Sequence, residues 1–212
     1  MTVAIKICGF TRPEDIDAAV ELGVDAIGLV LADDAHVHLT HAQLTSLIER
    51  IPRERVKAIA VLGPADEAQA KEALALGFDR LQIVVKPEQD FSPSIKKFVI
   101  PVYFDNSDVY SQVKAWSLPQ TSTRGPFDCI TIDGPAGGGK GISADHSRVA
   151  QCAVTHPIML AGGLRANNVA EAIKTVQPVA VDVSSGVESA PGIKCAEKMQ
   201  NFIEAVRGLQ SS

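Results

Sequence analysis

Three ionisable side chains stand at the ends of short aliphatic runs, where acid–base chemistry could be carried out. They are Cys8, Asp133 and Asp182. Lys6 precedes Cys8 by two residues, so the two side chains point to the same side of an extended strand. A carboxyl group whose pKa is raised by burial can donate a proton at neutral pH, and a thiolate can accept one. One hypothesis is therefore that Cys8 and Asp133 form a general acid–base pair.

Each of these residues also has a purely structural interpretation. Cysteine is among the most frequently buried residue types, so Cys8 can simply fill the core. Asp133 precedes a Gly-Pro pair and can form an Asx turn. Asp182 can cap the Ser-Ser-Gly turn that follows it. Spacing alone does not decide between these interpretations and the catalytic one.

Two glycine-containing segments near the end of the chain have the character of a phosphate site. They are LAGGL at residues 160–164 and DVSSGVE at residues 182–188, and each follows a short apolar run. Backbone N–H groups at such corners, backed by helix N-termini, bind a phosphate without any lysine. In a (β/α)8 barrel this site is frequently built by the loops after the seventh and eighth strands. The residues expected to bind phosphate are Gly162, Gly163, Ser184, Ser185 and Gly186.

Eight strand-like aliphatic runs alternate with helical patterns along the chain. The runs are residues 3–7, 26–31, 58–62, 80–85, 98–104, 129–132, 158–160 and 179–183. The first helix is expected after a capping-box pattern at Thr11-Arg-Pro-Glu14 and to stop at Gly23. Further helices are expected at residues 42–50, 66–76, 107–117, 144–150, 166–176 and 195–207, with a weak one around 89–97.

Eight such units in one chain are typical of a parallel α/β fold. A doubly wound open sheet is the alternative, but it usually has fewer strands, and no G-x-G-x-x-G follows the first run. The pattern therefore favours an α/β fold with a single (β/α)8 TIM barrel over residues 1–207, followed by a C-terminal tail over 208–212.

Composition narrows the possible partners and compartment. The chain has 212 residues, is 46% hydrophobic but only 5% aromatic, and carries a formal charge of −5. No basic cluster points to nucleic acid or an anionic membrane. No stretch approaches the length of a membrane span, and the first residues lack the features of a signal peptide. The four cysteines are widely spaced, as in reduced cytoplasmic proteins, so a cytoplasmic enzyme is expected.

Several motifs together resemble the phosphoribosylanthranilate isomerase family of the tryptophan pathway. KICGFT at residues 6–11 resembles the family's opening, and residues 17–28 look like its first helix and second strand. Gln82 matches the start of its QLHG segment, and Asp133 the aspartate after its sixth strand. The LAGGL and DVSSGVE segments, extended to Val169 and Lys194, are nearly complete matches. The resemblance spans the whole chain and implies the TIM-barrel fold.

The family carries out an Amadori rearrangement, which converts an N-(5-phosphoribosyl) aromatic amine into a 1-deoxyribulose 5-phosphate. The resemblance implies that Asp133 is the general acid that opens the sugar ring and that Cys8 is the base that removes the C2 proton. Lys6 is expected to lower the pKa of the Cys8 thiol. Lys6, Gln82 and Asp182 are expected to bind substrate. No metal or organic cofactor is implied, and either a monomer or a homodimer is compatible with the sequence.

The departures from the family pattern cluster at the end that holds the aromatic acid. An ungapped alignment places Ala35-His36-Val37 where the family has Ser-Pro-Arg, whose arginine pairs with the anthranilate carboxylate. His36 and His38 are the candidate substitutes, and with His41 they also suggest a metal site, although a surface loop is the better interpretation. Further departures are Ile83, Val84 and Val85 in the QLHG segment, Lys140, Ala144, His146 and Cys195.

These departures predict an altered specificity with intact catalysis, and hence weak activity on phosphoribosylanthranilate relative to an amine without the ortho-carboxylate. In the alternative interpretation, another arginine or Lys140 binds that carboxylate from a shifted loop. A different class of function, a non-catalytic phosphosugar-binding protein, needs only the glycine loops. Retention of Cys8 and Asp133 favours the enzyme, because a binding protein has no use for the pair.

Overall fold

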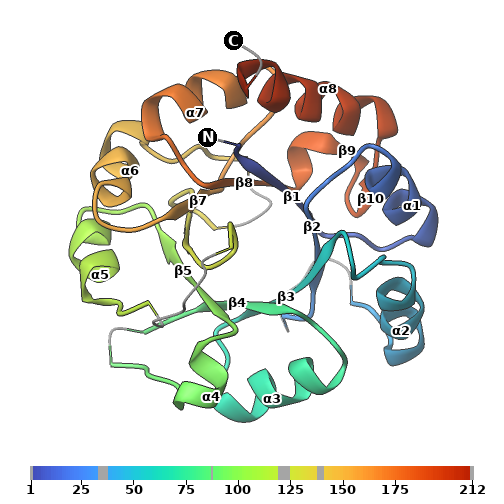
Figure 1. Cartoon of the computed structure of the whole chain (residues 1–212), viewed down its shortest axis with the longest axis horizontal. Helices are drawn as coiled ribbons and strands as arrows, with labels where there is room; N and C mark the ends of the chain where they lie inside the picture. The colour runs from blue at the N-terminus through green and yellow to red at the C-terminus, as the bar shows by residue number, and fades with distance from the viewer. Residues whose placement is uncertain (1, 33–37, 87, 119–124, 138–140, 211–212) are drawn as a thin grey trace.

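The computed structural model describes residues 2–32, 38–86, 88–118, 125–137 and 141–210, which form a closed barrel of eight parallel strands surrounded by helices (Figure 1). The strands are β1 (Ala4–Cys8), β2 (Ala26–Val30), β3 (Lys57–Gly63), β4 (Arg80–Val84), β5 (Val99–Phe104), β6 (Ile130–Asp133), β7 (Ile158–Leu160) and β8 (Ala180–Val183). They pair in chain order, and β1 closes the ring on β8 with Lys6 opposite Asp182. The predicted barrel is confirmed.

Helices cover the outside of the barrel between successive strands. They are α1 (Pro13–Glu21), α2 (His41–Glu49), α3 (Glu67–Ala75), α4 (Pro93–Lys96), α5 (Val109–Ala115), α6 (His146–Ala153), α7 (Val169–Val176) and α8 (Ala196–Arg207). The helix predicted to be weak is the single turn α4. In Figure 1, α8 lies beside α1, so the last helix closes the outer ring next to the first. Among the described helices, none is both long and apolar enough to cross a membrane.

The aliphatic strands bury two separate sets of side chains. The larger set fills the space between the strands and the helices. The smaller set alternates with it along the strands and fills the end of the barrel where the strands begin: Ala4, Ala26, Ile59, Ile100, Phe127, Cys129, Met159 and Ala180. Because this end is packed with apolar side chains, polar chemistry is confined to the other end.

The segment between β8 and α8 contains elements that the sequence patterns did not indicate. A 3₁₀ turn, η1 (Ser185–Val187), is followed by a small antiparallel hairpin of β9 (Glu188–Ala190) and β10 (Ile193–Lys194). A second 3₁₀ turn, η2 (Gly208–Gln210), follows α8 within the predicted tail.

The capping box expected at Thr11 is not formed, and that prediction was wrong. The N-cap of α1 is Arg12, whose side chain binds the Asp15 carboxylate. The Thr11 hydroxyl instead donates to the carbonyl of Gly192, 2.6 Å away in the hairpin. The Thr11 hydroxyl, which the local pattern predicted would cap α1, therefore binds a residue far away in the sequence.

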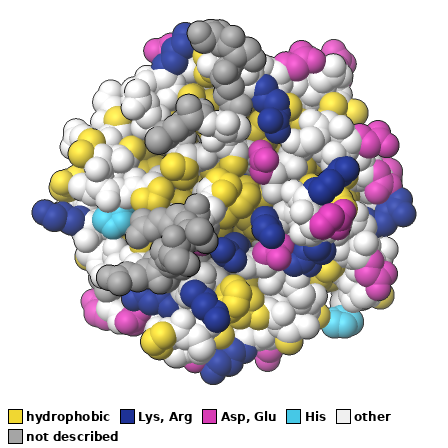
Figure 2. All heavy atoms as spheres, viewed as in Figure 1, with side chains coloured by type: hydrophobic (Ala, Val, Ile, Leu, Met, Phe, Trp, Pro, Cys, Tyr) yellow, Lys and Arg dark blue, Asp and Glu magenta, His cyan; other side chains and the backbone are white. Residues whose placement is uncertain are grey.

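The molecular surface mixes charges of both signs. On the face that Figure 2 presents, Lys and Arg side chains lie among Asp and Glu side chains, around a hydrophobic middle. This arrangement agrees with the small net charge of −5.

Candidate active site

A cavity of about 650 Å³ opens where the strands end, and it collects most of the residues singled out in the sequence. Cys8, Gln82, Asp133, Gly162, Gly163, Asp182, Ser184, Ser185 and Gly186 line it. The rest of the described wall includes Phe104, the four valines Val30, Val61, Val84 and Val102, and Thr131. The cavity is thus polar near β6, β7, β8 and β1 and mostly apolar at the ends of β2 to β5, with Gln82 of β4 as the polar exception.

A layer of polar side chains forms the floor of the cavity. The Lys6 ammonium, fully buried, lies 2.8 and 2.9 Å from the two carboxylate oxygens of Asp182. The Gln82 amide donates to the Thr131 hydroxyl at 3.0 Å and approaches Asp182 at 3.4 Å. The carboxylate offsets the desolvation of the ammonium: burial lowers the pKa of Lys6, but Asp182 and Cys8 together raise it above its ordinary value. Lys6 therefore stays charged beneath the cavity.

Gly28 on β2 makes room for this layer. A β-carbon at residue 28 would lie 2.7 Å from the Lys6 ammonium and 2.8 Å from the Cys8 sulfur. The Lys6 side chain, from the neighbouring strand β1, occupies the space that a side chain at residue 28 would fill. Gly28 was part of a matching motif, but nothing in its spacing indicated this role.

The Cys8 thiol lies at the end of β1 and is only 9% exposed. Burial raises its pKa, Lys6 and Lys194 lower it, Asp182 raises it, and the net direction is upward. Lys6 lowers this pKa, as expected, but desolvation of the thiolate outweighs it, so the net shift is upward.

Asp133 lies at the end of β6, beside the loop after β7. Burial raises its pKa to about 6, although a hydrogen bond from the Gly134 amide at 2.7 Å and the charge of Lys6 oppose that shift. This contact is to the adjacent amide and is not the Asx turn that the sequence suggested, because Pro135, two residues on, has no N–H to donate. A carboxyl with a pKa near 6 can hold a proton at close to neutral pH.

The loops after β6, β7 and β8 pack backbone against backbone, which only glycine permits. Gly162 and Gly163 have φ of +87° and +62°, and a β-carbon on Gly162 would lie 2.3 Å from the Gly134 nitrogen. A β-carbon on Gly186 would lie 2.0 Å from the Leu164 oxygen. The Asn168 amide donates to the Gly163 carbonyl at 3.0 Å and steadies the turn. Gly162, Gly163 and Gly186 of this packed backbone line the cavity.

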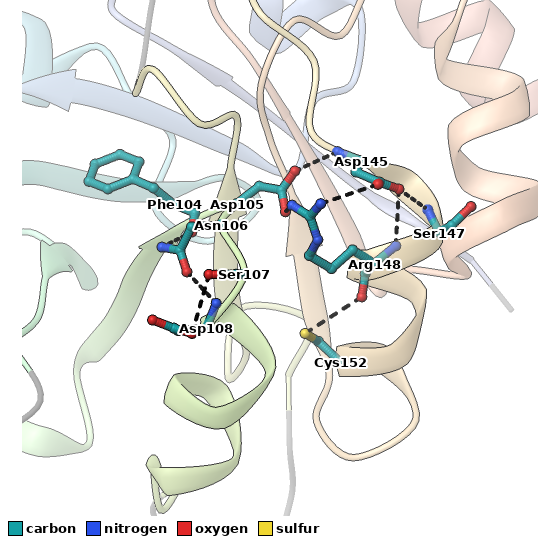
Figure 3. A network of polar contacts seen from close by, with 9 residues as sticks. All are labelled: Phe104, Asp105, Asn106, Ser107, Asp108, Asp145, Ser147, Arg148 and Cys152. Carbon is teal, nitrogen blue, oxygen red and sulfur yellow. Dashed lines mark hydrogen bonds and ion pairs between the residues drawn. The ribbon is translucent and has the colours of Figure 1, made fainter.

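A second network ties the loop after β6 to the end of β5 (Figure 3). The Asp105 carboxylate accepts hydrogen bonds from the Asp145 amide at 2.6 Å and from Arg148 at 2.7 Å. The Asp105 amide donates to the Asp133 carbonyl at 2.9 Å. Figure 3 shows the adjacent Phe104 ring directed away from this network, and Phe104 lines the cavity.

The other candidate residues either lie outside the described residues or border a different pocket. His36 and Val37 lie outside the described residues, as does Lys140. His38 is exposed and borders a separate pocket of about 280 Å³ beside His41 and Leu44. Within the described ranges, no three His, Cys, Asp or Glu side chains are placed to hold a metal ion.

The comparisons with known proteins agree with this geometry. Residues 5–205 match the model of the family described as N-(5'phosphoribosyl)anthranilate (PRA) isomerase. The chain is 34% identical over 214 residues to N-(5'-phosphoribosyl)anthranilate isomerase of Bordetella avium, covering 98% of this chain and 96% of the relative.

Solved structures share the fold. Phosphoribosyl anthranilate isomerase from Thermus thermophilus superposes with a TM-score of 0.81 at 24% identity, covering 98% of this chain and 100% of the other. A phosphoribosyl anthranilate isomerase in complex with reduced 1-(o-carboxyphenylamino)-1-deoxyribulose 5-phosphate superposes with a TM-score of 0.77, also at 24% identity, with the same coverage. By the family match and the relative's identity, this chain belongs to the N-(5'phosphoribosyl)anthranilate isomerase family.

Proposed function

We propose that this protein isomerises N-(5'-phosphoribosyl)anthranilate to 1-(2-carboxyphenylamino)-1-deoxyribulose 5-phosphate in tryptophan biosynthesis. Membership of the isomerase family supports this function. The observation that supports it for this chain is the placement of a buried thiol and a carboxyl of raised pKa around one cavity, which the glycine loops after β7 and β8 also line.

The proposed first step uses Asp133. Its protonated carboxyl donates to the furanose ring oxygen, the bond between that oxygen and C1 breaks, and the amine nitrogen stabilises C1 as an iminium. The pKa of about 6 for Asp133 keeps a usable fraction of the acid protonated near neutral pH.

The proposed second step uses Cys8. The thiolate removes the C2 proton, and the electron pair of that bond moves toward the iminium to give an enolamine, which tautomerises to the ketone. The iminium accepts the electrons, so the sequence of steps balances without an added oxidant or reductant. The thiolate is disfavoured by burial, and the charges of Lys6 and Lys194 reduce that cost.

The substrate is held from two ends in this proposal. Gly162, Gly163, Ser184, Ser185 and Gly186 bind the phosphate, and we call their loops, together with the end of β1, the phosphate side. The valines and Phe104 at the ends of β2 to β5 contact the aromatic ring, and we call them the aglycone side. Lys6, Asp182 and Gln82 lie between the two, beneath the sugar.

The compartment proposed for this reaction is the cytoplasm. All four cysteines are free thiols, as expected where disulfides are kept reduced.

Growth of a tryptophan auxotroph that lacks the isomerase tests the proposal. The wild-type chain is expected to restore growth without tryptophan, and the Cys8→Ala and Asp133→Asn chains are expected not to. Turnover of phosphoribosylanthranilate by the purified protein gives the direct measurement. Binding of phosphosugar without turnover, together with failure to restore growth, would reject the isomerase and favour the non-catalytic alternative.

A further inference from the structure

Lys194 is a buried lysine that sequence reasoning noticed only as part of a motif. Its side chain is fully buried, on the two-residue strand β10 of the hairpin after β8. The ammonium lies 2.6 Å from a Glu188 carboxylate oxygen, and that carboxylate is itself only 14% exposed. A buried ion pair has a large desolvation penalty, so a fully buried charge at this position needs a physical explanation.

The Lys194 ammonium stands where the loop after β8 meets the end of β1. It lies 3.5 Å from both the hydroxyl and the carbonyl oxygen of Ser184, at the outer limit of a hydrogen bond. A β-carbon on Gly9 would be 3.5 Å from the ammonium and 3.1 Å from the Ser184 hydroxyl. The Phe10 ring covers it at 5.6 Å. The Lys194 ammonium thus lies between Ser184 and the backbone of Gly9.

The hairpin that carries Lys194 is itself held from the other end of the chain. The Lys194 amide donates to the buried Asp15 carboxylate at 3.0 Å, and Arg12 pairs with the same carboxylate. Thr11 binds the carbonyl of Gly192 at 2.6 Å. The cation is therefore fixed in place relative to β1 and does not depend on a flexible loop.

We propose that Lys194 is a positioning residue of this site, which holds Ser184 of the phosphate side against the Gly9 end of β1 and places one positive charge behind both the phosphate loop and Cys8. The role of Lys194 in turnover rests on the proposed function. Its expected effects on phosphate binding and on the Cys8 thiol do not depend on turnover. The charged groups that act on the Cys8 thiol are Lys6 of β1, Asp182 of β8 and Lys194 of β10. Of these, only Lys194 also contacts a phosphate-loop residue.

The test uses Lys194→Met combined with Glu188→Gln, which removes both charges and leaves no unpaired buried carboxylate. The first readout is the Kd of inorganic phosphate by calorimetry, which is expected to rise about tenfold, as for loss of a charge-assisted hydrogen bond. The second is the pH at which half of Cys8 reacts with iodoacetamide, followed on the peptide that contains it. This midpoint is expected to move up by about one pH unit.

The single variant Lys194→Arg keeps the positive charge, so the pH at which half of its Cys8 reacts is expected to equal the wild-type value. The matched control is Arg80→Met with Asp128→Asn, which removes another partly buried ion pair, 2.9 Å apart and outside the cavity lining. It is expected to lower the melting temperature and to leave both readouts unchanged.

An unchanged phosphate Kd or an unchanged Cys8 midpoint in the double variant overturns the proposal, as does an equal change in the control. Both readouts can be measured on a protein that does not turn over phosphoribosylanthranilate. Failure of the proposed function is therefore distinguishable from failure of this inference.

Discussion

The two sides of the cavity are built by different means. On the phosphate side, three loops pack through glycine backbones, and the Asn168 amide donates to the Gly163 carbonyl within one of them. The hairpin after β8 is held from the start of the chain, because the Thr11 hydroxyl donates to the Gly192 carbonyl and the Asp15 carboxylate accepts from the Lys194 amide. On the aglycone side, valines and Phe104 project from the ends of β2 to β5.

A backbone surface that depends on close contacts cannot be altered one residue at a time, whereas a wall of side chains can. This difference fits the distribution of most of the motifs that carry the family resemblance, which lie on the phosphate side; Gln82 on β4 is a match outside it, and Cys195 after β10 is a departure beside it.

The strongest test of this comparison removes the proton-transfer groups that stand between the two sides. Cys8→Ala and Asp133→Asn are each expected to lower kcat/KM by about 10²–10⁴-fold, the usual contribution of a general acid or base. Cys195→Ser is the control, because Cys195 is the half-buried N-cap of α8 and serine is a good cap. A Cys8 or Asp133 variant that keeps more than about a tenth of the wild-type activity contradicts the assignment.

A charge placed in the phosphate side tests the rigidity of its backbone. Gly163→Asp is expected to raise the Kd of inorganic phosphate at least about a hundredfold, because the carboxylate repels the anion and the space is already filled by Ser143 and Gly141. Gly23→Asp is a matched control at a similar positive φ of +79° with open space around it. Unchanged binding in Gly163→Asp would move the phosphate site elsewhere.

The pH dependence of stability tests the burial of Asp133. Its pKa is about 6 in the folded protein against an ordinary value near 4, so between these pH values unfolding releases a proton and stability falls as pH rises. The loss amounts to about 3 kcal/mol and is complete above pH 6. Asp133→Asn removes it. The free energy of unfolding of the variant minus that of wild type is expected to be about 2 kcal/mol larger at pH 7.5 than at pH 4, because part of the loss has already occurred by pH 4; a difference that does not change with pH rules this out.

The pH profile of kcat/KM follows from the same two groups. The active state needs Asp133 protonated and Cys8 ionised, although the Cys8 pKa lies above that of Asp133. Such a state has a low but constant population between the two pKa values and declines on either side. We expect a plateau that falls below about pH 6 and again at the thiol's raised pKa. A profile that falls already on going from pH 6.5 to 8 would contradict this assignment.

Restoring the family's arginine tests whether the aglycone side has changed its specificity. Val37 lies outside the described residues, so this prediction comes from the sequence alone. Val37→Arg is expected to raise kcat/KM on phosphoribosylanthranilate by about fivefold or more, through a charge-assisted pair with the carboxylate. Activity on an N-(5-phosphoribosyl) amine without that carboxylate serves as the control and is expected to stay the same. An efficient wild type that gains nothing from the substitution shows that another residue binds the carboxylate.

The smallest expected effect concerns the one aromatic side chain in the described cavity wall. Phe104→Leu is expected to raise KM for an aromatic substrate about threefold, since an aromatic contact contributes little beyond its buried area. The Kd of inorganic phosphate is expected to remain at the wild-type value. An equal rise in the KM for the aromatic substrate and in the Kd of inorganic phosphate contradicts the separation of the aglycone side from the phosphate side.

The sequence patterns were sufficient for the barrel because its strands are short, aliphatic and separated by helical repeats. All eight predicted runs are strands, and no end is shifted by more than one residue. The hairpin of β9 and β10 was missed because strands of three and two residues carry no alternation.

The site was predicted less completely, since depth and long-range contacts do not appear in local patterns. The upward shift of the Cys8 pKa depends on burial, which outweighs the Lys6 charge that spacing had suggested. The Thr11 hydroxyl binds Gly192, a partner 181 residues away. His38 was chosen from an ungapped alignment across residues 33–37, which the structure does not describe.

The closure of β1 on β8 has a consequence for synthesis of the chain. Lys6 and Asp182 are 176 residues apart, so the first strand leaves the ribosome long before the carboxylate that compensates its buried ammonium. Until then the nascent sheet has two open edges, and a desolvated lysine would have no counter-charge. Lys6 can therefore be buried with its counter-charge only after β8 has been made, and until then the incomplete sheet exposes strand edges of the kind that are prone to aggregate.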